Sequence, residues 1–132
     1  MSKDKTQIID LLKTSNKKPT VIRNHSEKGF LVDNKLYQHS IIIDAFSVSK
    51  WILRNNKIKE SDFNFLDNLN SYPELVLLGV GNITEEPFFE IRSKMSKLSI
   101  PIEIMTTPAA CRTWNVLLSE GRNTLACIKH EY

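Results

Sequence analysis

Pro73-Glu74-Leu75-Val76-Leu77-Leu78-Gly79-Val80-Gly81 is the stretch that decides the fold, because its continuous apolar run lies between a proline and two glycines. A short run of this kind is typical of a strand that is covered on both faces of a sheet. We therefore predict a central strand over residues 75–78 and interpret the segments on either side of it.

A helix and a strand are predicted directly after this central strand. Thr84 is the expected N-cap of the helix, with Pro87 in its first turn. The apolar face of the helix is expected to consist of Phe88, Ile91, Met95 and Leu98. Residues 102–105 follow as the next predicted strand.

A second helix and a last strand complete this half of the chain. The helix is predicted from Thr107 through Glu120, with Gly121 as the residue just past its end. The strand is predicted over residues 124–128. Strands that alternate with helices imply right-handed crossovers and a sheet with helices packed on it, so the predicted fold class is α/β.

The segment before the central strand has a β-like pattern. Residues 20–43 contain short apolar segments, a turn at Asp33-Asn34 and the run Ile41-Ile42-Ile43. We predict an N-terminal β-meander that ends in a buried strand. Ser61 is the expected N-cap of a short helix between the meander and the central strand.

The composition is that of one soluble globular domain. The 132 residues include 18 Lys+Arg and 15 Asp+Glu, and 41% of them are hydrophobic. We expect a partly flexible basic leader over residues 1–20 and a single α/β domain over residues 21–132. The leader lacks the interleaved aromatic residues of a nucleic-acid platform, and no window approaches the roughly 20 apolar residues of a spanning helix. Neither nucleic-acid binding nor a transmembrane segment is therefore predicted.

The cysteine content indicates a reducing compartment. Cys111 and Cys127 are the only cysteines, and they form neither a CxxC motif nor a Cys/His pair at zinc spacing. The first thirty residues contain no apolar segment of the length that a secretory signal needs. The sequence thus predicts a cytoplasmic protein without a structural metal.

A polar stripe is predicted along the second helix. Arg112, Asn115 and Ser119 are spaced at i, i+3 and i+7, which places them on one side, away from the core face with Ala110 and Trp114. Arg112 is unfavourably placed, because an exposed cation near a helix N-terminus loses roughly 0.3 to 1 kcal/mol against the macrodipole. An anion is therefore expected beside it.

Two sources of this anion remain open. One is a carboxylate of the same chain, which would make Arg112 a structural clamp. The candidates for this role are Glu85, Glu86, Glu103 and Glu120. The other source is a ligand, held by Arg112, Asn115 and free N–H groups after Thr106 and Thr107, which together would form a small anion cradle.

The glycines after the central strand do not complete a nucleotide site. Gly79-Val80-Gly81 resembles the start of a dinucleotide motif, but Thr84 stands where the third glycine belongs. No nucleotide cofactor is therefore predicted. We expect Gly79 and Gly81 to form a side-chain-free exit from the sheet that faces the Arg112 helix across the strand ends.

No set of residues in the sequence demands catalysis. Cys111 lies about one turn into the second helix, where a thiol pKa can be lowered, but it also borders the core face. A structural cysteine is the favoured interpretation, and a thiolate nucleophile is the alternative. His25, His39 and His130 carry no local signature and are interpreted as surface or internally satisfied residues.

The chain resembles a known family in two segments. These are residues 73–81 and the stretch around Met105-Thr106-Thr107-Pro108-Ala109-Ala110-Cys111-Arg112-Thr113-Trp114-Asn115, which extends to Arg122. They are similar to a family of small single-domain proteins, known as a domain of unknown function, that includes the mitochondrial respiratory complex I assembly factor 3 and the adipogenesis-associated domain proteins. The likeness runs from Val21 to Ile128. It implies a single three-layer α/β domain with a central mixed sheet.

This chain departs from the family pattern at several positions. Thr106 stands where an acidic residue is expected, Trp114 replaces a tyrosine, and Lys129-His130 replaces an apolar ending. The first change removes a carboxylate that could have paired with Arg112. A site identical to that of relatives is therefore not implied.

The resemblance implies a non-enzymatic binding or assembly protein that assists respiratory complex I assembly. Its partner would be a respiratory complex subunit or another assembly factor, and it would be cytoplasmic or peripheral at the inner membrane through that partner. The expected binding residues are Gly79, Gly81, Thr106, Thr107, Arg112, Asn115 and Ser119. The alternative is a small-molecule anion-binding protein or a small enzyme that uses Cys111 as a thiolate. No cofactor is expected in either case.

Overall fold

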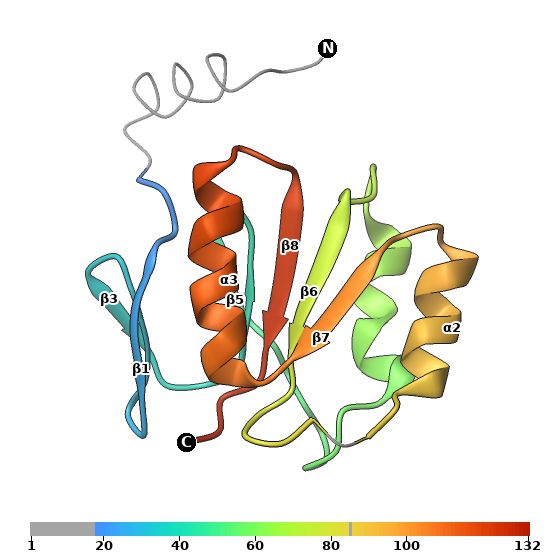
Figure 1. Ribbon diagram of the computed structural model, residues 1–132, viewed down its shortest axis with the longest axis horizontal. Helices are drawn as coiled ribbons and strands as arrows, with labels where there is room; N and C mark the ends of the chain where they lie inside the picture. The colour runs from blue at the N-terminus through green and yellow to red at the C-terminus, as the bar shows by residue number, and fades with distance from the viewer. Residues whose placement is uncertain (1–17, 85) are drawn as a thin grey trace.

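The computed structural model describes residues 18–84 and 86–132, and Figure 1 shows how their helices and strands are arranged. The prediction of a flexible leader falls mostly on residues outside this described part. In chain order the elements are β1 (Ile22–Ser26), β2 (Gly29–Val32), β3 (Lys35–Tyr37), β4 (Ile41–Ile43), β5 (Val48–Lys50), the 3-10 helix η1 (Glu60–Asn68), β6 (Leu75–Gly79), α2 (Phe89–Lys97), β7 (Ile102–Met105), α3 (Thr107–Ser119) and β8 (Thr124–Ile128).

A mixed sheet with strand order β5-β4-β8-β6-β7 forms the centre of the fold. Strand β6 pairs in parallel with both β7 and β8, whereas β4 pairs antiparallel with β8. Every residue of β6 is buried, so the central strand predicted from the apolar run is confirmed. The predicted β-α-β-α-β order is also confirmed, as β6-α2-β7-α3-β8.

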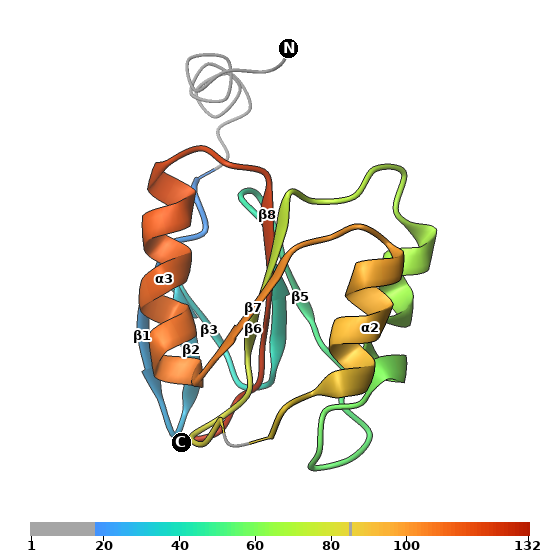
Figure 2. The same cartoon turned by 45° about the vertical axis from the view of Figure 1, so that its right-hand side comes forward.

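The mixed sheet is the middle one of three layers. Figure 2 shows it nearly edge-on, with α3 and the strands β1 to β3 on one face and α2 and η1 on the other. The first face is covered by a core that includes Phe30, Ile43, Leu77 and Trp114. The opposite face is covered by a core that includes Phe63, Val76 and Met95. The α/β class and the three-layer arrangement are therefore confirmed.

The predicted meander is divided between two sheets. Strands β1, β2 and β3 form a separate antiparallel sheet, whereas β4 joins the central sheet beside β8. Ile41 and Ile43 are fully buried, so β4 gains more apolar contact in the centre than it would at the edge of the small sheet. Strand β5 was not predicted, because it is short and its residues are partly or fully exposed.

Both predicted N-caps on the far face of the sheet are wrong. Helix η1 begins after Lys59, whose N–H donates to the Asp62 carboxylate at 2.8 Å, so Ser61 lies inside the helix. Helix α2 begins after Phe88, which adopts a left-handed conformation with φ 56°, so Thr84 and Pro87 precede the helix. That conformation allows the Phe88 ring to pack in the core together with the first turn of α2.

Helix α3 follows the prediction closely. It begins after Thr106 and ends at Ser119, and Gly121 takes the left-handed conformation with φ 71° that ends many helices. Its buried face includes Ala110 and Trp114. The indole N–H of Trp114 donates to the carbonyl of Thr20 at 2.8 Å, which fixes the chain just before β1 against the helix.

Candidate binding site

Thr107 joins three chain segments at the carboxyl ends of the central strands. Its hydroxyl donates to the carbonyl of Lys129 at 2.7 Å and accepts from the N–H of Gly81 at 2.9 Å. Its own N–H donates to the carbonyl of Gly81 at 2.7 Å. Because the side chain is fully buried and satisfied, Thr107 holds the strand ends together and offers nothing to a ligand.

Gly79 and Gly81 are required by close packing at the same strand ends. A Cβ atom at Gly79 would lie 2.9 Å from Cβ of Ala110, because α3 passes directly over the strand. Gly81 has φ 103°, and a Cβ atom there would overlap the Glu131 carboxylate. The predicted side-chain-free exit is therefore present, and this chain's own residues fill the space beside it.

Glu131 occupies the position that a ligand anion would take at this exit. Its carboxylate accepts the N–H of Asn82 at 2.7 Å and lies 3.3 Å from the ammonium of Lys129. The hydrogen bond from Asn82, assisted by Lys129, holds the pKa of the Glu131 carboxyl below its usual range. The C-terminal segment thus fills the space directly beside Gly81, while an open cavity of about 380 Å³ lies next to it, lined among others by Val80, Asn82, Lys129 and Glu131.

The start of α3 has no free N–H groups for an anion cradle. The N–H of Thr107 donates to Gly81, and the N–H of Ala110 donates to the carbonyl of Thr106 at 2.9 Å. The Thr106 hydroxyl accepts the N–H of Ala109 at 3.4 Å, and Pro108 has no N–H. The cradle expected after Thr106 and Thr107 is therefore not formed.

Asn115 is used inside the molecule. Its Oδ1 accepts the N–H of Ile22 at 2.9 Å, and its Nδ2 donates to the carbonyl of Ile22 at 2.8 Å. Ser119 is exposed and donates to the carbonyl of Val116 at 2.6 Å. Of the predicted stripe, only Arg112 keeps a polar group that no other described residue engages.

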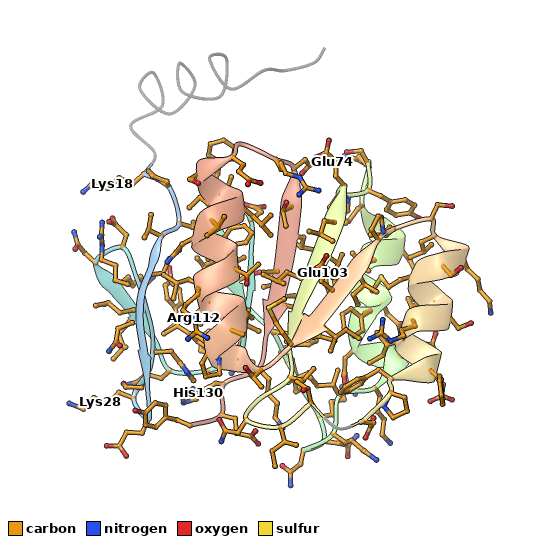
Figure 3. All side chains as sticks on the ribbon, in the orientation of Figure 1. Lys18, Lys28, Glu74, Glu103, Arg112 and His130 are labelled. Carbon is orange, nitrogen blue, oxygen red and sulfur yellow. The ribbon has the colours of Figure 1, made fainter. Side chains whose placement is uncertain are left out.

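Arg112 has no ion-pair partner within the described part of the chain. No carboxylate there lies within 4.0 Å of its guanidinium, and its side chain is exposed. Figure 3 shows Arg112 on the side of α3 that faces β1, while Glu103 lies on the side of β7. Glu86 pairs instead with Lys57 at 2.9 Å, and Glu85 lies outside the described residues. The internal clamp is therefore not formed with any described carboxylate.

A cavity of about 260 Å³ lies beside Arg112, between β1 and α3. Helix α3 contributes Cys111 and Asn115 in addition to Arg112. Strand β1 contributes Ile22, Arg23, Asn24 and His25, and the remaining lining residues are Pro108 and Tyr132. No aspartate or glutamate is among the lining residues, and the charged side chains there are those of Arg23 and Arg112.

His25 and His130 meet at the lower end of this cavity. Nε2 of His25 lies 3.1 Å from Nδ1 of His130, and the His25 ring stacks on Phe30 with centroids 4.4 Å apart. Burial, with a smaller effect of His130, lowers the pKa of His25 to about 4. Figure 3 shows His130 below Arg112, near the same end of β1. His25 is thus neutral near pH 7.

Cys111 has the properties of a structural cysteine. It is buried against the core on the first face of the sheet. Burial raises the pKa of its thiol to about 12, and the nearby Arg112 only partly opposes this effect. At neutral pH the thiol form dominates, which argues against a thiolate nucleophile.

His25, His130 and Tyr132 were not predicted at this site, where His25 and Tyr132 line the cavity and His130 contacts His25. His25 and His130 are 105 positions apart, and the Tyr132 ring lies 5.6 Å from the His25 ring, centroid to centroid. Only the packing of the C-terminal segment against β1 brings them together. No local spacing could have indicated this cluster.

Comparisons with known proteins give a family for the chain. The model of a family described as "Protein of unknown function (DUF498/DUF598)" matches residues 22–128, which is most of the chain. The matched region contains both sheets and α3. It therefore includes Arg112 and nearly all of the cavity.

Two named relatives show the range of this similarity. NADH dehydrogenase [ubiquinone] 1 alpha subcomplex assembly factor 3 of Mus musculus is 29% identical over 121 residues, which are 91% of this chain and 65% of that protein. The 13 kDa major membrane protein of Francisella tularensis subsp. holarctica is 28% identical over 111 residues, covering 83% of this chain and 89% of that protein. The chain thus spans less than two-thirds of the length of the mouse relative.

The fold is also found among solved structures. The crystal structure of an outer membrane protein from Bartonella henselae superposes with a TM-score of 0.72 at 24% identity, covering 86% of this chain and 97% of that one. This likeness establishes the fold alone. In the described residues of the present chain, no helix combines the length and the apolar character needed to cross a bilayer.

Proposed function

Because this chain belongs to the DUF498/DUF598 family of proteins of unknown function, we propose that it is a non-enzymatic binding protein that assists the assembly of a respiratory complex. Its contact surface is the face between β1 and α3, around Arg112. The family relative named as an assembly factor for NADH dehydrogenase supports the choice of partner class, which is a respiratory complex subunit or another assembly factor.

The observation that carries this proposal is the guanidinium of Arg112, which lies at an open cavity and has no ion-pair partner among residues 18–84 and 86–132. Arginine is enriched at protein interfaces, because its planar group can bind a carboxylate through two hydrogen bonds. Every other member of the predicted stripe is engaged within the chain, as Asn115 is with Ile22. Of this stripe, Arg112 is therefore the residue whose polar group no described residue engages and which can bind a partner.

The chemistry of the site supports binding over catalysis. The Cys111 thiol is protonated at neutral pH, and His25 is neutral and held between Phe30 and His130. Neither group is placed as a nucleophile activated by a base. The second candidate function is that of an anion-binding protein without enzymatic activity. The positive charge of the arginine side chains that line the cavity favours this candidate.

Affinity purification from the native cells tests the proposal. The tagged full chain is compared with Arg112→Gln and with Arg122→Gln, a matched control in which an exposed arginine beyond the other end of α3 is changed. We expect a respiratory complex subunit or assembly factor to be enriched by the wild type and by Arg122→Gln. Its recovery with Arg112→Gln should fall roughly tenfold, because an interfacial charge pair is lost.

Circular dichroism of all three proteins shows whether the variants are folded. Equal recovery of the partner by folded Arg112→Gln would overturn the assigned contact surface. If no respiratory protein is enriched by the wild type, the assembly role itself is wrong. A peripheral location at the inner membrane would follow from binding to such a partner.

A further inference from the structure

We infer that the cavity between β1 and α3 binds a carboxylate side chain from an acidic segment of the partner protein. This inference rests on the proposed function, because it names the part of the partner that the Arg112 surface would contact. The inference adds the chemical group of the partner that enters the cavity.

The charge around the cavity calls for a negative occupant. Arg23 and Lys18 share a single carboxylate, that of Asp33, at 3.5 and 4.0 Å. Arg112 has no such partner within the described part of the chain, and no acidic residue lines the cavity. Arg23 and Arg112 are thus the cationic side chains that line the cavity, and only Arg23 has a carboxylate partner among the described residues. A carboxylate placed beside Arg112 would balance the excess.

The size of the cavity favours a side chain over a cofactor. Its volume of about 260 Å³ is below the roughly 300 to 1,000 Å³ typical of sites for cofactors and drug-sized ligands. One aspartate or glutamate side chain fits such a space. The cavity is open to solvent, so a side chain can enter while the backbone of its own segment stays outside.

The donors present suit a carboxylate better than a phosphate. Phosphate sites at helix starts use several free backbone N–H groups. The N–H groups at the start of α3 are not free, because they donate hydrogen bonds to Gly81 and Thr106. Asn115 is likewise engaged with Ile22 through both atoms of its amide. One planar guanidinium remains, and it matches the two oxygens of a carboxylate.

An aromatic rim can receive the apolar part of the same segment. The Tyr132 side chain is 73% exposed, and its ring lies edge-on to His25 at 5.6 Å between centroids. Pro108, an apolar residue, is also exposed and lines the cavity. A peptide that inserts an acidic side chain would therefore cover these two rings with its neighbouring residues.

The test is a titration of the isotope-labelled full chain followed by NMR. The probe is the peptide acetyl-Gly-Glu-Gly-amide, and the matched controls are acetyl-Gly-Gln-Gly-amide and inorganic phosphate. We expect saturable shifts of the Arg112 side-chain Nε–H and of the β1 amides with the Glu peptide in the millimolar range. The Gln peptide should shift these signals at least roughly tenfold less at equal concentration, because it lacks the negative charge. Phosphate should also shift them roughly tenfold less, because the N–H groups at the start of α3 are already bonded and only the guanidinium remains to hold it.

Two variants complete the test. Arg112→Gln should abolish the shifts of the β1 amides, and Arg122→Gln should leave them unchanged. Equal shifts with the Gln peptide, equal shifts with phosphate, or undiminished shifts in Arg112→Gln would each overturn the inference. If partner recovery depends on Arg112 and the Glu peptide does not bind, only the carboxylate inference is wrong. If the peptide binds and no partner is recovered, the assembly role is wrong and the site stands.

Discussion

Asn115 in the middle of α3 holds Ile22 at the start of β1 through both polar atoms of its amide. The two hydrogen bonds measure 2.9 Å to the N–H and 2.8 Å to the carbonyl of Ile22. The Asn115 side chain therefore makes the two hydrogen bonds to the backbone of Ile22 that a neighbouring strand would otherwise make. This pair fixes the small sheet to the helix and forms one wall of the cavity.

Replacing Asn115 should destabilise the fold. Asn115→Ala leaves the partly buried N–H and carbonyl of Ile22 without partners, which costs roughly 1 to 3 kcal/mol. Ser119→Ala, on the same side of the helix, removes only a local bond to Val116 and should change stability by less than about 0.5 kcal/mol. Urea unfolding followed by circular dichroism measures both. Equal stability of Asn115→Ala and wild type would contradict the structural role.

The Thr107 hydroxyl should be more important for stability than other threonine hydroxyls of α3. Thr107→Val keeps the shape but leaves the carbonyl of Lys129 and the N–H of Gly81 unpaired, at a cost of about 2 kcal/mol. Thr113→Val is the matched control, since that side chain is only half-buried and makes no hydrogen bond within the described residues. Thermal unfolding of the two variants gives the comparison. A larger loss in Thr113→Val would refute the assignment.

The central fold could be predicted from sequence because its signals are local. The apolar run of β6 and the 3.6-residue spacing of Ala110 and Trp114 in α3 each lie within one element. The divided meander could not be predicted, because the pairing of β4 with β8 joins segments more than 80 positions apart. The left-handed conformation of Phe88 could not be predicted either, because it depends on the core in which the Phe88 ring packs.

The candidate site was predictable only in part for the same reason. Helical spacing placed Arg112 and Asn115 on one side of α3, and the structure agrees. The spacing could not show that Asn115 is engaged by Ile22, 93 positions away. Nor could the spacing show that Thr107 is engaged by Gly81 and Lys129, or that the Glu131 carboxylate occupies the space beside Gly81. Such contacts exist only after the sheet has formed.

Alkylation of Cys111 should be slow in the native protein. With its pKa raised to about 12, the thiolate fraction is very small at pH 7, and the side chain is buried. Iodoacetamide labelling, with sites assigned by peptide mass spectrometry, should show Cys111 and Cys127 reacting mainly after unfolding in urea. Rapid labelling of native Cys111 below pH 7 would instead support the thiolate enzyme.

Stability should fall between about pH 6.5 and pH 4 because of His25. The pKa of His25 is about 4 in the fold, against 6.5 for an unperturbed histidine, so the unfolded chain binds more protons in this interval. The contribution of His25 to the free energy of unfolding is fully present above pH 6.5 and is lost as the pH falls towards 4. In His25→Gln, the melting temperature should therefore decrease less over this range than in wild type.

His39→Gln is the control for this pH dependence. His39 lies outside the cavity, and its Nδ1 is 2.9 Å from the carbonyl of Ser40. We expect His39→Gln to keep the full decrease of the wild type. An identical decrease in wild type and His25→Gln would show that His25 does not titrate as its burial beside His130 requires.

Hydrogen exchange of the full chain, free and bound to the respiratory protein that co-purifies with it, locates the contact surface directly. We predict slower exchange on binding in peptides that cover β1 and the first half of α3, where Arg112 lies. A rival apolar surface exists around Ile83 and Phe89, which are 68% and 76% exposed. Protection at that surface, with β1 and α3 unchanged, would contradict a partner contact at the Arg112 cavity.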